Sequence, residues 1–104
     1  MVNPLESDSR EDLKLNGQEI AVVRGVHNGN IYVFGGATLI LRGIVKGSIY
    51  IEDNATAFIH GIVFGDVTNN GGRLKHYGVI KGRLNRLAGE TIIWPKSIIG
   101  EITN

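Results

Sequence analysis

Hydrophobic and polar positions repeat along this chain with a period of about 18 residues. The repeat reads GVHNGNIYVFGGATLILR from Gly25, GIVKGSIYIEDNATAFIH from Gly43 and GIVFGDVTNNGGRLKHY from Gly61. A fourth copy, GVIKGRLNRLAGETIIWP, begins at Gly78. Each copy opens with Gly, two mostly apolar residues, a variable residue, a second Gly, a polar residue and then Ile, Val or Leu. A short fixed period of this kind is typical of a β-solenoid, in which each copy forms one coil.

The aligned copies place apolar residues in columns, and these columns predict the hydrophobic core. Within one copy, apolar positions alternate with variable ones, which is the period of two expected of β-strands. The predicted inward columns are Leu13, Ile31, Ile49, Val67, Leu84 and Ile102; Ala21, Leu39, Ala57, Leu74 and Ile92; His27, Val45, Val63, Ile80 and Ile98; and Val23, Leu41, Ile59, His76 and Trp94. We therefore predict an all-β protein, a small single-domain, three-faced β-solenoid (β-helix) of about five coils of ~18 residues.

The two ends of the chain are expected to differ from its middle. Residues 1–12 have almost nothing to bury and are predicted to form a polar N-terminal tail or cap, while residues 13–104 form the solenoid. A cap would cover the open edge of the first coil. Toward the C-terminus, residues 69–72 (NNGG) predict a tight turn with one residue missing, and Trp94 is placed inward, where its ring would plug the core.

Composition narrows the possible functions. The chain of 104 residues has a formal net charge of +1 and 20% charged residues, so its overall charge does not favour nucleic acid or an anionic membrane as partner. It has no Cys, which excludes a disulfide framework and a thiolate metal site. No segment approaches the ~18 apolar residues of a spanning helix, and the polar N-terminus lacks a signal-peptide core. We expect a cytoplasmic protein with no membrane span.

No constellation of residues predicts a catalytic, cofactor or metal site, so we expect no enzyme activity and no cofactor. Hexapeptide-repeat acyltransferases have a similar coil length, but they place Gly directly after the inward aliphatic residue, which this chain does not. The related zinc carbonic anhydrases need three converging His. His27 and His76 are predicted inward and His60 outward, on different coils, which favours a hydrogen-bonding role. An acyltransferase-like protein is the third functional alternative.

Outward apolar residues predict a protein-binding surface. One outward column holds Val22, Ile40, Phe58 and Ile93, broken by Lys75, and a second holds Val26, Ile44, Ile62 and Val79. Tyr32 and Tyr50 stack in a third. Continuous apolar stripes of this size usually mark an interaction surface, for which we name Tyr32, Ile40, Tyr50 and Phe58. The alternatives are that the N-terminal tail covers one row, or that the inward assignment has slipped by one residue at a corner.

A basic stretch follows the regular coils. It contains Arg73, Lys75, Lys81, Arg83 and Arg86. These cations form a solvated face, or they recognise an acidic protein partner, or they contact phosphates. In the second case Lys75, Arg83 and Arg86 would act as a rim that steers the partner and affects the association rate more than the affinity. No nucleic acid is expected as a partner.

The repeat resembles the bactofilins, a family of polymer-forming bacterial cytoskeletal proteins. Gly25 to Ile31, Gly43 to Ile49, Gly61 to Val67 and Gly78 to Leu84 carry the resemblance, which covers about residues 13–104. The resemblance implies a right-handed β-helix that is non-enzymatic and self-associates end to end. Stacking of that kind would use Leu13 and Leu15 at one end, and Trp94 and Ile98 at the other.

Two functional hypotheses follow from these observations. The first is a bactofilin-like, self-associating structural or scaffold protein, whose partner is another copy of itself. The second is an immunity or inhibitor protein that binds and neutralises an acidic partner such as a toxin domain. Small size, an irregular C-terminal surface and the lack of a catalytic set suit both hypotheses.

Overall fold

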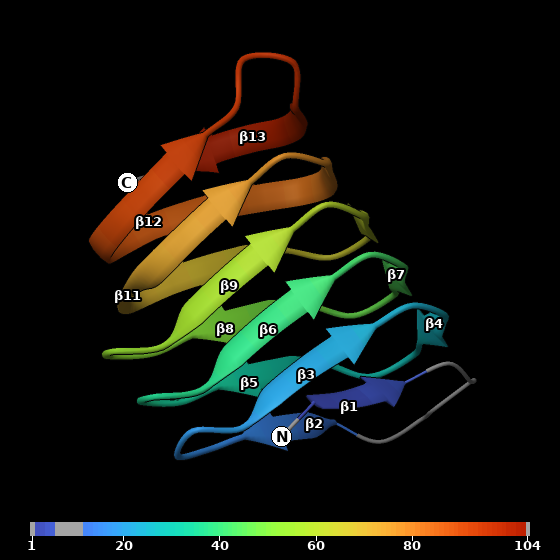
Figure 1. Ribbon diagram of the computed structural model, residues 1–104. Helices are drawn as coiled ribbons and strands as arrows, with labels where there is room; N and C mark the ends of the chain where they lie inside the picture. The colour runs from blue at the N-terminus through green and yellow to red at the C-terminus, as the bar shows by residue number, and fades with distance from the viewer. Residues whose placement is uncertain (1, 6–11, 104) are drawn as a thin grey trace.

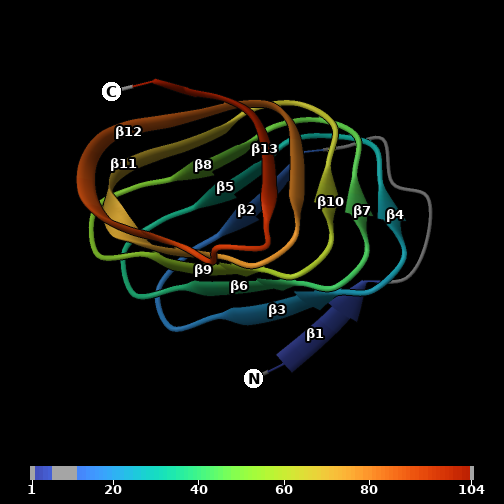
Figure 2. The same ribbon diagram turned by 90° about the horizontal axis from the view of Figure 1, so that it is seen from above.

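The computed structural model describes residues 2–5 and 12–103, and these residues form stacked parallel β-strands with no helix (Figure 1). The coils are about 18 residues long and make about five turns, as the sequence predicts. Seen from above, the chain winds repeatedly around one central core (Figure 2). The prediction of an all-β solenoid is therefore confirmed.

Each regular coil contributes one strand to each of three faces. The β4–β7–β10 face holds β4 (Val26–His27), β7 (Ile44–Val45) and β10 (Ile62–Val63). The β5–β8 face holds β2 (Leu13–Leu15), β5 (Ile31–Val33) and β8 (Ile49–Ile51), and the β6–β9 face holds β1 (Val2–Leu5), β3 (Ile20–Val23), β6 (Thr38–Leu41) and β9 (Thr56–Ile59). In the later coils β11 (Val67–His76), β12 (Val79–Ile93) and β13 (Ile98–Thr103) bend around the corners from one face to the next.

Alternation along the strands separates core from surface. In β5 and β8 the two outer residues are buried and the middle one is half-buried, and β6 and β9 alternate in the same way. The register runs from Leu13 through Ile31, Ile49, Val67 and Leu84 to Ile102, as predicted for this column. Each fully buried aliphatic side chain contributes roughly 1.5–3 kcal/mol to folding. This continuous column is part of the core against which the three faces pack.

Three of the four predicted columns are wrong in the last coil. His76 pairs with Ile93 and Leu74 pairs with Thr91, one residue earlier in each case than predicted, so Ile93 is inward. Trp94 and Ile92 are therefore exposed, and Trp94 does not plug the core.

Ile98 is also misplaced, because Ile80 pairs with Ile99. The cause is a longer turn. Residues 94–97 join β12 to β13, whereas only two residues occupy this corner in the preceding coils, for example Arg24 and Gly25.

Asn69 explains the irregular turn that the sequence indicates at residues 69–72. It pairs with Ile51 and is fully buried, in a column that is aliphatic in the preceding coils. Its side-chain nitrogen donates to the carbonyl oxygen of Glu90 at 2.9 Å, and its side-chain oxygen accepts the Gly72 N–H at 2.9 Å. A buried polar side chain is stable only when it is satisfied in this way. The amide therefore holds the shortened corner.

A ladder of polar side chains runs along the corner between the β4–β7–β10 and β5–β8 faces, and we call it the corner ladder. Its members are Asp12, Asn30, Ser48 and Asp66, each of which accepts the backbone N–H at the same position of the next coil. The distances lie between 2.8 and 3.0 Å. This ladder accounts for the polar residue after the second Gly of each repeat.

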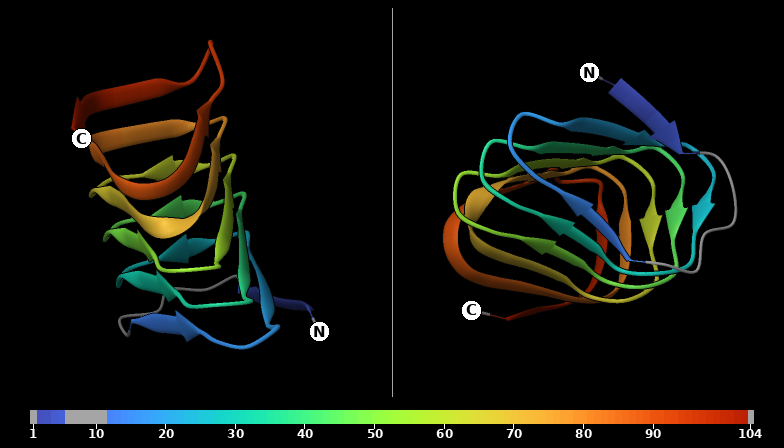
Figure 3. Two further views of the ribbon diagram at one scale, coloured as in Figure 1. Left: turned by 90° about the vertical axis from the view of Figure 1, so that its left-hand side faces the viewer. Right: turned by 90° about the horizontal axis from the view of Figure 1, so that it is seen from below.

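The two ends of the solenoid differ. At the N-terminal end β1 pairs with β3, and the inward residues Leu15 and Ala21 are buried. At the C-terminal end Ile102 is 46% exposed, although Leu84 below it in the same column is fully buried. The termini lie at opposite ends of the stack (Figure 3). Residues 6–11 of the predicted tail or cap lie outside the described residues.

Candidate binding surface

The predicted aromatic and aliphatic binding residues point outward, but they do not form one platform. Tyr32 and Tyr50 lie on the β5–β8 face, with their rings stacked at a centroid distance of 5.0 Å. Ile40 and Phe58 pair on the β6–β9 face. All four are half-buried, which confirms the predicted outward orientation. A corner of the coil separates the two pairs, so a single partner surface would have to bend around it to contact both.

The predicted basic rim is dispersed around the solenoid. Lys75 lies on the β6–β9 face, with its ammonium group 5.7 Å from the centre of the Phe58 ring. Arg83 lies at the corner ladder and forms an ion pair with Glu101 at 3.1 Å. Arg86 is exposed on β12, opposite Asn69 on the β5–β8 side. These three side chains therefore lie at three different positions around the solenoid and do not form one rim.

The predicted end residues differ in their exposure. Leu15 is only 4% exposed, and Leu13 packs against the core, so Leu15 does not present an open face to another chain. Trp94 and Ile98 are 52% and 62% exposed at the C-terminal end. Only the C-terminal pair is available for contact with a second molecule.

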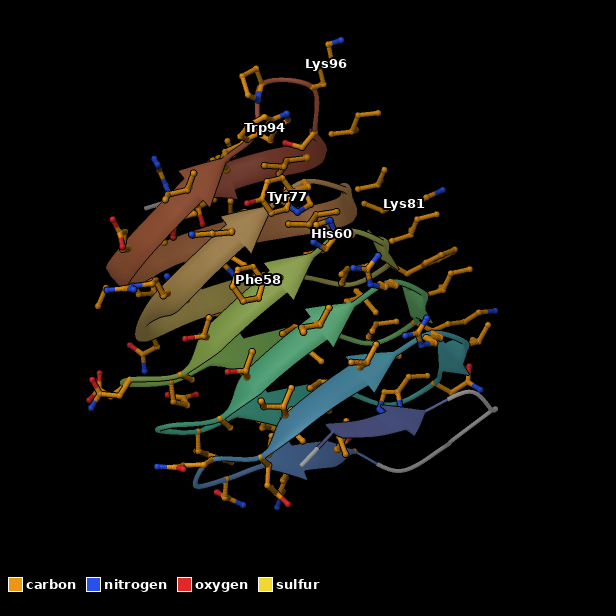
Figure 4. The ribbon with its side chains drawn as sticks, viewed as in Figure 1. Phe58, His60, Tyr77, Lys81, Trp94 and Lys96 are labelled. Carbon is orange, nitrogen blue, oxygen red and sulfur yellow. The ribbon has the colours of Figure 1, made fainter. Side chains whose placement is uncertain are left out.

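A column of rings and cations on the corner between the β6–β9 and β4–β7–β10 faces was missed by the sequence analysis. From coil to coil it holds Arg24, Arg42, His60, Tyr77 and Trp94. The His60 and Tyr77 rings are stacked, with centroids 4.7 Å apart and planes at 7°, and Tyr77 and Trp94 lie 5.4 Å apart (Figure 4). Neighbouring parallel strands are ~4.8 Å apart, and this spacing brings the rings of successive coils into contact.

Cations surround this column, and no carboxylate lies among them in the part of the chain that the structure describes. The surface consists of residues 20–27, 38–47, 56–64, 74–81 and 91–100, and the sequence has no Asp or Glu in these ranges. Its cations are Arg24, Arg42, Lys46, Lys75, Lys81 and Lys96. The described acidic side chains lie at the other two corners or near the N-terminal end: Asp12, Glu19, Glu52, Asp53, Asp66, Glu90 and Glu101. We call this surface the basic aromatic face.

The rings of the basic aromatic face are largely engaged by its own side chains. The ammonium groups of Lys81 and Lys46 lie 5.1 and 5.8 Å from the centre of the Phe64 ring, and come from the coils after and before it. Lys75 covers Phe58 in the same way. Such cation–π contacts are worth about 0.5–1 kcal/mol at exposed sites. On this surface, lysine ammonium groups therefore lie over the rings of Phe58 and Phe64.

The three His residues, which are the remaining candidates for a metal or catalytic site, are separated from one another. His27 and His76 are buried and His60 is exposed, and no group of three potential metal ligands occurs within residues 2–5 and 12–103. Burial lowers the pKa of His76, and its hydrogen bond with the Ile98 carbonyl opposes that effect. A shallow polar depression of about 410 Å³ lies at the third corner, where Arg73 and Glu90 form an ion pair across it at 3.4 Å.

Comparison with known proteins gives no further assignment, because no family model, curated protein or solved structure matches this chain. Within the described residues, none of the secondary structure is an apolar helix of membrane-spanning length. The fold and surface thus define a β-solenoid with an open C-terminal end and one basic aromatic face.

Proposed function

We propose that this protein is a non-catalytic, protein-binding structural protein that self-associates through its open C-terminal coil. The exposure of apolar side chains at this end carries the proposal. Leu87, Ile98 and Ile102 are 61%, 62% and 46% exposed. Ile102 follows the fully buried Leu84 in an inward column, and Ile98 follows the half-buried Val79 in an outward one. Burying the exposed part of each side chain would contribute roughly 1 kcal/mol.

The backbone of the last coil supports the same proposal. β13 pairs with the first part of β12, and no further strand among the described residues covers β13 or residues 86–93 of β12. An uncovered strand edge presents unpaired N–H and C=O groups and is a ready template for another chain. The exposed aliphatic residues and the free edge therefore lie at the same end of the solenoid.

The difference between the two ends determines the kind of assembly that we propose. At the N-terminal end the edges of β1, β2 and β4 also have no further partner strand among the described residues, but the inward residues Leu15 and Ala21 are buried, so a head-to-tail filament would gain less apolar burial there. Two open C-terminal ends can instead meet around a two-fold axis, which closes the assembly at two copies. We therefore favour a dimer joined through its C-terminal coils over the unlimited end-to-end polymer that the bactofilin resemblance implies.

Sedimentation velocity over a concentration series tests this proposal. The wild-type chain should dimerise, and Ile98→Glu and Leu87→Glu should each yield a monomer that keeps its strand circular-dichroism spectrum. Lys14→Glu, a substitution at the opposite end of the solenoid, is the matched control and should dimerise as the wild type does. A wild-type protein that stays monomeric at every concentration contradicts the proposal.

Electron microscopy separates the dimer from a filament. If the wild-type chain forms filaments and Trp94→Glu abolishes them, the hypothesis of end-to-end stacking through both ends is supported and a closed dimer is excluded. The inhibitor alternative needs a surface that selects a different protein. The basic aromatic face, on which no described residue is acidic, is the observation that favours it.

A further inference from the structure

We infer that the basic aromatic face is a docking site for an acidic polypeptide segment, bound through its Asp and Glu side chains. The centre of the site lies away from the C-terminal strand edge that is proposed to mediate self-association, and the two surfaces meet at Ile98. This centre is the corner of the solenoid occupied by His60 and Tyr77, with Phe58 on one side and Lys81 on the other (Figure 4). Lys75 lies over the Phe58 ring.

Charge segregation is the first argument. Six cations lie on this face although the formal net charge of the chain is only +1, and the acidic side chains that the structure describes lie on other parts of the surface. If the charges were interspersed, a chain of this composition would not present a face that carries cations alone. Unopposed cations on one surface create a potential that attracts and orients an anionic partner. The ligand therefore carries several negative charges.

The geometry of the rings selects among anionic ligands. Single-stranded nucleic acid binds by stacking its bases on open aromatic faces. Here the rings of His60 and Tyr77 stack on each other, and Lys75 and Lys81 lie over the rings of Phe58 and Phe64. The edges of aromatic rings carry partial positive charge. These rings are already in contact with other side chains, and the ammonium groups above them suit carboxylates better than bases.

An apolar strip beside the cations supplies the second part of a polypeptide site. Ile44, Ile62 and Val79 form a half-buried outward column on the β4–β7–β10 face, between the ring column and the column of Lys46 and Lys81. Aliphatic side chains of a partner can pack there while its carboxylates contact the flanking cations. A site with alternating apolar and cationic columns fits a mixed acidic and apolar segment.

Trp94 offers a direct measurement, because it is the one Trp in the chain and lies in the ring column. Its fluorescence should change on titration with a peptide of alternating Glu and Leu, and the affinity should fall as salt is added. The charge-reversing pair Lys75→Glu and Lys81→Glu should weaken binding about tenfold or more. Lys14→Glu, on the β5–β8 face, should leave the affinity unchanged. Lys96→Glu tests a cation of the basic aromatic face that lies on an exposed turn.

Competing ligands decide the outcome. Tighter binding of oligo(dT), or binding to phosphatidylglycerol vesicles but not to the peptide, overturns the inference, as does the absence of any peptide binding. Equal weakening by Lys14→Glu would show attraction by overall charge alone and also overturn it. Peptide binding by monomeric Leu87→Glu, a substitution outside the basic aromatic face, supports the inference independently of self-association, so the two proposals can fail separately.

Discussion

Removal of one acceptor from the corner ladder should destabilise the whole solenoid by a predictable amount. Ser48 Oγ accepts the backbone N–H of Asp66 at 3.0 Å, while the N–H of Ser48 itself donates to Asn30 Oδ1 at 2.8 Å. Ser48→Ala keeps the second bond and removes the first. The Asp66 N–H is partly buried, so its loss of a partner should lower the free energy of unfolding by about 1 kcal/mol.

The assay is urea unfolding followed by circular dichroism, with the same slope expected for each variant because the surface exposed on unfolding is unchanged. For a domain of this size, the thermal midpoint should fall by roughly 4–8 °C. Ser48→Asn is the matched control, since Asn30 and Asp66 fill the same position in the neighbouring coils. Equal loss of stability in Ser48→Ala and Ser48→Asn would refute the role of the acceptor and indicate a packing effect instead.

Three further substitutions probe other parts of the molecule. Phe58→Ala should leave the thermal midpoint nearly unchanged, because the ring is outward, but should weaken acidic-peptide binding in the Trp fluorescence titration by removing the ring beneath Lys75. Burial lowers the pKa of His76 below the ordinary value of 6.5, so its contribution to stability should be complete above pH 6.5 and be lost as the pH falls below it toward the lowered pKa. His76→Leu should flatten that pH dependence in urea unfolding, and a profile identical to wild type would contradict this. Arg83→Glu should lower the midpoint only slightly, because Arg83 and Glu101 are largely exposed, and should change peptide affinity less than the Lys75 and Lys81 substitutions do.

The repeat predicts the coils well because a solenoid repeats the same side-chain environment at a fixed interval. The register from Leu13 to Ile102 follows from that interval alone. The prediction fails where a corner changes length. Asn69 reads as a turn residue in the sequence, yet it is buried, because the shortened corner leaves backbone groups that need its amide. The turn of residues 94–97 has no Gly to mark its extra length.

The binding surface was harder to predict for a related reason. Residues that are close in sequence lie on different faces of a solenoid, whereas residues one coil apart are in contact. Lys75 and Arg83 therefore form a basic cluster only in the sequence. The ring column could be recognised only with the correct register, because a shift of one residue moves Trp94 from the surface into the core.

The longer turn of residues 94–97 has a consequence for how this chain can change in length. Pairing is offset after this turn, and an irregularity between Ile80 and Arg83 restores it, so that Leu84 again pairs with Ile102. Part of the extra length at a corner is thus absorbed within the same coil. The corners should accept grafted peptides at the Pro95–Lys96 turn, where a foreign loop would be displayed at a fixed height above a rigid, modular frame.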